Sequence, residues 1–218
     1  MKKFLPTLQQ VSLFEGLTGP ELTGILGCLG ARPMQAEKGS PIFREGEPAI
    51  FIGIVLEGAV QVLREDFYGN RSILSHVGPR ELFGESYAFA PTETLPVSIT
   101  AVEDTKLLLL DSRRITACCS NACAFHNQVI FNLLRLVAGK NLDLHQKIQI
   151  TAQRTTRDKL MTYLLSVAKQ QGPTFHIPYD RQGLADYLEV DRSGLSTEIG
   201  KLRKEGILEC EKNHFRLL

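Results

Sequence analysis

The sequence predicts an α+β protein: an N-terminal antiparallel β-roll, similar to a double-stranded jelly roll, then one long helix and a C-terminal winged helix-turn-helix. Short apolar runs separated by glycines fill residues 33–111, a heptad pattern follows, and two short amphipathic helices lie near the C-terminus. A chain of 218 residues is long enough for two domains. We expect domain boundaries at 1–120, 121–150 and 151–218.

The first 111 residues divide into a helical and a strand-rich part. Residues 1–30 have apolar residues at helical spacing, such as Leu13, Leu22 and Leu26. From residue 33 the apolar runs become short and are bounded by glycines, which is typical of a β-sandwich or a β-barrel. The expected strands are Phe51–Leu56, Ala59–Leu63, Ser72–Val77, Val97–Val102 and Lys106–Leu110.

One helix is expected from about Asn121 to Ile150. Its apolar residues recur in alternating steps of four and three, which is the spacing of a coiled-coil seam. An Asn at one seam position favours two-stranded pairing, so we expect a parallel homodimer. The alternative is that the seam packs on the chain's own β-roll. The residues of the seam are Ile130, Leu134, Val137, Asn141, Leu144 and Ile148.

Residues 181–206 predict two helices joined by a tight turn. Asp191 is a favourable N-cap for the second helix, and Gly206 suits its C-terminus. Ile207–Leu208 and Phe215–Leu218 predict a closing hairpin, hence a winged variant. A helix-turn-helix places its second helix in the DNA major groove, whereas an ordinary helical hairpin has only a solvated polar face. The residues expected to face inward are Leu184, Ala185, Leu188, Leu195, Ile199 and Leu202.

Composition limits the class of protein without naming a partner. The net charge is +1, and residues 150–218 hold 11 Lys and Arg against 9 Asp and Glu, an excess of only +2. The N-terminus lacks the apolar run of a signal peptide, and no stretch reaches the length of a membrane span, so we expect a cytoplasmic protein. Five cysteines, an odd number, argue against a disulfide framework. Because no set of catalytic residues stands out, we expect no enzyme activity.

The ordered motifs resemble the Crp/Fnr family of bacterial transcription regulators along nearly the whole chain. The glycine-containing segments of the β-roll match at Phe43–Glu47, Glu57–Val60, Gly69 and Phe83–Glu85. One departure precedes the last segment, where Arg80-Glu81 replaces the family's usual Gly-Asp. In the helix-turn-helix, the match includes Arg181-Gln182 and Asp191-Arg192-Ser193.

The resemblance implies an effector-gated homodimer that binds an interrupted palindrome in double-stranded DNA, with RNA polymerase as a further partner. Arg192 is the expected base reader, because a guanidinium can donate twice to guanine. Ser193 stands where many members have Glu, so the half-site should depart from the family's usual one. The residues expected to contact DNA are Arg181, Gln182, Arg192, Ser193, Ser196, Thr197 and Lys201.

The resemblance places the effector between the β-roll and the long helix, but the phosphate-binding pattern is missing. No arginine lies between Arg80 and Arg113, so we expect no response to cyclic AMP, no bound cofactor, and an uncharged or weakly polar effector. The alternatives are a pocket filled by side chains, hence ligand-independent DNA binding, or a small-molecule binding module whose helix-turn-helix contacts only protein. The expected lining is Gly84, Glu85, Ser86, Tyr87, Pro96, Val97, Ser98 and Leu144.

Cysteines and histidines offer a second sensing hypothesis. If residues 118–126 are helical, Cys119, Cys123 and His126 lie on one face and could bind a metal or respond to redox state. The alternative is that the thiols pack inside and His126 lies at the surface. A single N-terminal cysteine, Cys28, argues against an iron–sulfur cluster. The remaining candidates, His76, His176 and His214, are expected to be isolated and structural or solvated.

Overall fold

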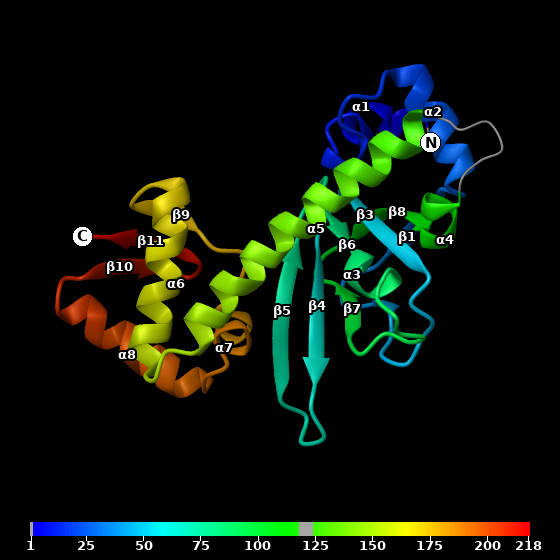
Figure 1. The fold of residues 1–218 in the computed structure, drawn as a ribbon. Helices are drawn as coiled ribbons and strands as arrows, with labels where there is room; N and C mark the ends of the chain where they lie inside the picture. Colours follow the sequence, from blue (N-terminus) through cyan, green and yellow to red (C-terminus); the bar gives the residue numbers. More distant parts are fainter. Residues whose placement is uncertain (1, 118–123) are drawn as a thin grey trace. The chain divides into compact units, whose positions relative to one another are not determined.

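The computed structural model describes residues 2–117 and 124–218 (Figure 1). The chain divides into two compact units: an N-terminal unit, Met1–Glu65 with Leu74–Asn141, and a C-terminal unit, Asp66–Ile73 with Leu142–Leu218. Within the described part of the chain, no helix is both long and apolar enough to cross a membrane.

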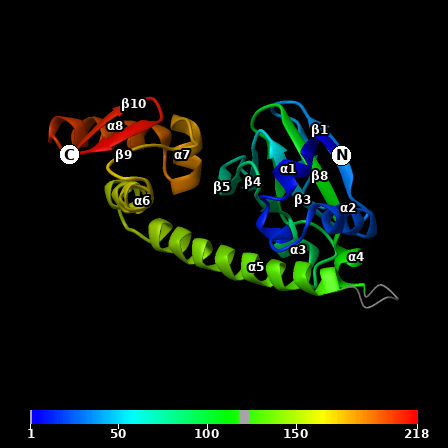
Figure 2. The same ribbon diagram turned by 90° about the horizontal axis from the view of Figure 1, so that it is seen from above.

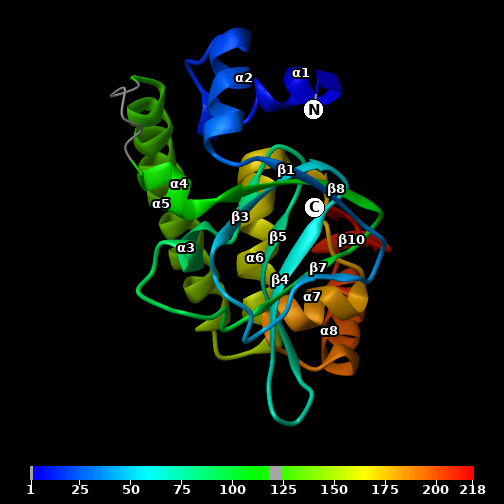
Figure 3. The same ribbon diagram turned by 90° about the vertical axis from the view of Figure 1, so that its right-hand side faces the viewer.

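Two four-stranded sheets form the β-roll of the N-terminal unit (Figure 3). The strand pairs whose registers are resolved are antiparallel, as predicted. In spatial order, one sheet contains β1 (Arg32–Ala36), β8 (Thr105–Asp111), β3 (Phe51–Glu57) and β6 (Leu82–Phe83), and the other β2 (Pro41–Phe43), β7 (Ser98–Ala101), β4 (Val60–Glu65) and β5 (Arg71–Val77). The sequence predicted five of these strands and missed β1, β2 and β6, which are short or contain proline.

The core of the β-roll is formed by side chains from both sheets, among them Val55, Val62 and Ile99. Phe83 of β6 is buried over Gly53 of β3, and its ring fills the space that a Cβ at position 53 would need. Gly58, between β3 and β4, has φ +83°, and a Cβ there would lie 2.6 Å from a backbone oxygen. Both glycines are therefore required by packing or by backbone conformation.

Short helices at the N-terminus pack against the first half of the long helix α5 (Ala124–Thr151) (Figure 2). The amide of Asn132 donates to the carbonyl oxygens of Leu13, at 3.0 Å, and Glu15, at 2.9 Å. The long helix ends within one residue of the predicted position, whereas its predicted start lies outside the described residues. The other helices of this unit are η1 (Lys2–Phe4), α1 (Leu5–Leu8), η2 (Ser12–Phe14), α2 (Gly19–Cys28), α3 (Glu85–Ala88) and α4 (Ser112–Thr116).

The C-terminal unit is a winged helix-turn-helix, as predicted. The side chains predicted to face inward from its two central helices are all buried in one core. Phe175 and Phe215 stack beneath its three-stranded sheet, whose order is β10-β11-β9. The elements are α6 (Thr156–Gln171), β9 (Thr174–His176), α7 (Arg181–Leu188), α8 (Arg192–Lys204), β10 (Leu208–Glu211) and β11 (His214–Leu217).

Candidate functional site

Helix α8 carries most of the residues predicted to contact DNA. Its first turn is fixed by Asp191, whose carboxylate accepts from the Gly194 N–H at 2.7 Å. Leu195, Ile199 and Leu202 point into the core, which turns the opposite, polar face of the helix to solvent. The exposed residues on this face are Arg192, Ser193, Ser196, Thr197 and Lys201.

The polar side chains of α8 differ in which hydrogen-bonding groups remain free to bind a ligand. The hydroxyls of Ser196 and Thr197 donate to the carbonyls one turn back, at 2.9 and 3.0 Å, so they present mainly acceptor oxygens. The Lys201 ammonium pairs with Glu198. Of all the residues that the structure describes, none pairs with the Arg192 guanidinium, whose donors are thus free for a partner.

The two candidates on α7 are already engaged within the C-terminal unit. Arg181 lies over the Phe215 ring, 6.0 Å from its centroid, and near the Cys210 sulfur. The Gln182 amide donates to Asp186 at 2.7 Å. Both side chains would have to exchange these contacts for phosphate oxygens in a complex with DNA.

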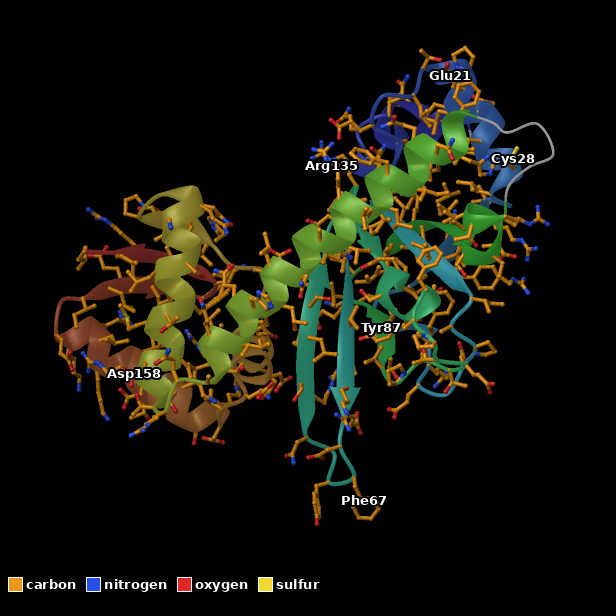
Figure 4. All side chains as sticks on the ribbon, viewed as in Figure 1. Glu21, Cys28, Phe67, Tyr87, Arg135 and Asp158 are labelled. Carbon is orange, nitrogen blue, oxygen red and sulfur yellow. The ribbon has the colours of Figure 1, made fainter. Side chains whose placement is uncertain are left out.

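An open hollow of about 520 Å³ lies where the N-termini of α6 and α8 come together. Thr155 caps α6 by accepting from the N–H of Asp158, a residue labelled in Figure 4. Helix N-termini carry partial positive charge, but carboxylates of Asp191 and Glu198 also line the hollow, and the two caps already accept from first-turn N–H groups. The sequence predicts a polar hinge at Thr151–Thr156 and a helix at Asp158–Gln170, and the helix begins two residues earlier, at Thr156. The lining residues are Thr155, Thr156, Arg157, Asp191, Ser193, Gly194, Thr197 and Glu198.

The predicted effector segment contains a buried ion pair. Gly84, with φ +82°, is the N-cap of α3, and the side chain of the following Glu85 is only 3% exposed. One carboxylate oxygen, Oε1, lies 2.9 Å from the ammonium of Lys140 on α5. The other, Oε2, is buried without a hydrogen-bond partner. Lys140 also donates to the Leu82 carbonyl, and so supplies the positive charge that the sequence seemed to lack.

The sequence did not reveal Lys140 as the partner of Glu85, because the two residues lie more than 50 positions apart. The only local signal was a lysine beside a seam residue, a position that is usually solvated.

The other predicted pocket residues lie in different environments. Val97 is buried in the core between the sheets, and the Ser98 hydroxyl accepts from the Glu45 N–H at 3.1 Å. Tyr87 (labelled in Figure 4) is half-buried, and burial together with the charge of Glu85 raises the pKa of its hydroxyl. Ser86 and Pro96 are exposed. Leu144 belongs to the C-terminal unit and is exposed.

The seam of α5 is exposed in the single chain. Leu134 is 66% exposed, and the other apolar seam residues are between 36% and 54% exposed. The chain's own N-terminal helices instead cover the neighbouring row that contains Val129 and Leu133. The alternative that the seam packs on the chain's own β-roll is therefore wrong.

The cysteine hypothesis falls largely outside the described residues, which do not include Cys119 and Cys123. His126 is described and is buried, so the expectation that it lies at the surface is wrong. Among residues 2–117 and 124–218, no three His, Cys, Asp or Glu side chains are placed to hold a metal ion.

Comparisons with known proteins agree with this arrangement. The family model described as "Cyclic nucleotide-binding domain" matches residues 33–122, and "Crp-like helix-turn-helix domain" matches residues 158–218. The chain is 28% identical to the "Cyclic AMP receptor protein" of Thermus thermophilus over 90% of its length and 87% of that protein. It is 23% identical to "Transcriptional activator protein FnrA" of Stutzerimonas stutzeri, over 86% of this chain and 76% of that one.

A solved structure shares the fold. The c-di-GMP-responsive global regulator CLP of Xanthomonas campestris aligns with a TM-score of 0.74 and 19% identity, covering 89% of this chain and 98% of that chain. At that identity the likeness supports the fold alone. With both domain models matched in order and full-length relatives that are transcription regulators, this chain belongs to the Crp/Fnr family of transcription regulators.

Proposed function

We propose that this regulator is a cytoplasmic homodimer that recognises an interrupted palindrome through α8, contacts RNA polymerase, and has no enzymatic activity. The observation that carries the proposal is the unpartnered Arg192 guanidinium at the first, exposed turn of a capped helix. In that position its donors can reach guanine O6 and N7 in the major groove.

Replacing Arg192 tests base reading directly. We first select a binding site from a pool of random duplexes, and then measure the affinity of Arg192→Ala for this site and for random competitor. The variant should lose about 1–3 kcal/mol on the selected site and much less on the competitor. Arg203→Ala, which removes an exposed arginine from the far end of α8, is the matched control. Equal loss on both duplexes would exclude base reading by Arg192.

The exposed seam of α5 supports a dimer. Six residues at coiled-coil spacing, five of them apolar, lack cover in the single chain, and a second copy of the same helix would provide it. Leu134→Glu should shift the protein to monomers in sedimentation experiments and abolish the preference for a palindrome. Leu165→Glu on α6 also places a charge at an exposed leucine, and should leave the dimer intact. A dimeric Leu134→Glu variant would exclude the seam as the interface.

We propose that an effector other than cyclic AMP gates DNA binding from the β-roll. Between Arg80 and Arg113 the sequence offers no arginine for a phosphate, and Lys140 is already paired with Glu85. The unpartnered Glu85 Oε2 favours a ligand that brings a hydrogen-bond donor. Titration calorimetry with cyclic AMP should show no binding, and tight binding would refute this.

A ligand-independent regulator is the second candidate, because the Glu85–Lys140 pair already occupies part of the expected effector site. Measuring the affinity for the selected DNA site across a panel of metabolites separates the two candidates. A compound that changes this affinity in the wild type and not in Glu85→Gln favours gating. A flat response across the panel favours the ligand-independent regulator.

A further inference from the structure

Two histidines that look isolated in the sequence lie against one another on the wing. His176 is the last residue of β9, His214 is the first of β11, and the two are direct partners in the antiparallel register. Their ring centroids are 4.4 Å apart, with an angle of 49° between the ring planes. The expectation that these histidines are isolated is therefore wrong.

The register explains why the rings are so close. The Ile177 N–H donates to the Asn213 carbonyl at 3.0 Å, so the hydrogen-bonded pair is the one next to the histidines. His176 and His214 thus form a non-hydrogen-bonded pair, the type whose side chains approach most closely. Sheet geometry, and not a chance rotamer, brings the two imidazoles together.

Both rings lie on the outer face of the wing. The next residues along each strand, Phe175 and Phe215, are buried on the opposite face. His176 is exposed and His214 is half-buried, so both remain accessible to solvent. Glu211 of β10 is the register partner of His214 on its other side and adds a carboxylate to the same row.

We propose that His176 and His214 form a two-histidine site for a divalent transition-metal ion such as Zn²⁺ or Ni²⁺. Neutral imidazole is a preferred ligand of these ions, and two imidazoles held by a rigid sheet lose little freedom on binding. Water completes the coordination, because in the described ranges no third His, Cys, Asp or Glu is placed to join them. The bound ion fastens β9, the strand before α7, to the wing.

The test uses the full chain with its cysteines alkylated, since thiolates would also bind Zn²⁺. Calorimetry with ZnCl₂ and NiCl₂ should show one saturable ion per chain, and MgCl₂ should show none, because Mg²⁺ prefers oxygen ligands. His176→Gln and His214→Gln should each weaken binding by about tenfold or more. His145→Gln, which removes an exposed histidine of α5, is the control and should bind like the wild type.

A measurement on the unmutated chain keeps the proposal independent of any folding defect. Paramagnetic Ni²⁺ at substoichiometric amounts should broaden the imidazole proton signals of His176 and His214 before those of the other histidines. Zn²⁺ should also raise the melting temperature of the wild type and not of His214→Gln. Unchanged affinity in both glutamine variants, no binding to the alkylated protein, or broadening first at other histidines would overturn the proposal.

Discussion

Two lysines of α5, seven residues apart and on the same face of the helix, show how differently the two units hold it. In the N-terminal unit, Lys140 meets the buried carboxylate of Glu85. In the C-terminal unit, Lys147 is buried against Tyr187, where it donates to the carbonyl and lies 3.7 Å from the ring centroid. Burial lowers the pKa of Lys147 to about 8, because the charge of Glu189 offsets only part of the lost hydration.

Burial alone therefore does not decide how a charged side chain contributes to stability. Lys140 neutralises a carboxylate that is itself out of reach of water, so removing the lysine leaves an isolated buried charge. Lys147 leaves no charge behind when it is removed. The first lysine should therefore matter most for stability, and the second for the response to pH.

The largest effect is expected from Lys140→Ala. Because Glu85 would remain buried and unpaired, the N-terminal unit should lose about 3 kcal/mol of unfolding free energy in urea titrations. Adding Glu85→Gln in the same chain should recover much of that loss. Arg135→Ala, on the same helix, breaks an exposed pair with Glu15 and should cost under about 1 kcal/mol (Figure 4). Equal losses of unfolding free energy in Lys140→Ala and Arg135→Ala would refute the contrast between the buried and the exposed ion pair.

A second substitution, in the β-roll, should disturb the packing that positions the Glu85–Lys140 ion pair. Gly53→Ala pushes on the Phe83 ring, in the strand that leads to Glu85, and should destabilise the N-terminal unit by about 2 kcal/mol. Gly24→Ala in α2 is the control, since a Cβ there meets nothing. If Gly53→Ala were as stable as the wild type, the packing of β6 over β3 would not hold the ion pair in place.

A smaller effect is expected at the start of α6. Thr155→Ala removes an N-cap and should cost the C-terminal unit about 1 kcal/mol, measured by thermal unfolding. Thr155→Ser retains the cap oxygen and should restore most of the stability. A serine variant no better than alanine would show that the methyl group of Thr155, not its oxygen, stabilises this end of the helix.

The smallest effect is the pH dependence due to Lys147. Its folded pKa of about 8 lies below the ordinary value of 10.5, so the unfolded chain binds more protons between these values. The cost of burying the charge is full below pH 8 and falls as the pH rises. Relative to Lys147→Met, the stability of the wild type should rise by under about 1 kcal/mol from pH 7.5 to 8.5. Parallel pH profiles would contradict the lowered pKa.

Periodicity in the sequence predicted the fold class and most of its elements, but not the short strands β1, β2 and β6. The turn before α8, its Asp191 cap and the inward leucines follow from local spacing, and the structure confirms them. The family resemblance singled out Glu85, which the structure shows to be buried, but not its partner Lys140.

Pairings between distant residues could not be predicted. Lys140 and Glu85, or His176 and His214, meet only because of strand registers and helix packing that no local pattern encodes. Arg80 is a related case, because it has φ +72° at a position where the family usually has glycine. An arginine does not indicate a positive φ, so the residue type gave no sign of this turn.

Lys140 and Asn141 are neighbours on α5, and successive residues of a helix point about 100° apart. Lys140 pairs with Glu85 of the β-roll, whereas Asn141 lies in the exposed seam. A ligand that displaced Lys140 from Glu85 would free the helix at the residue next to Asn141, in the seam through which we propose that two copies pair. We expect such a ligand to allow α5 to rotate about its axis. The rotation would change how the seam residues beside Lys140 pair with those of a second copy.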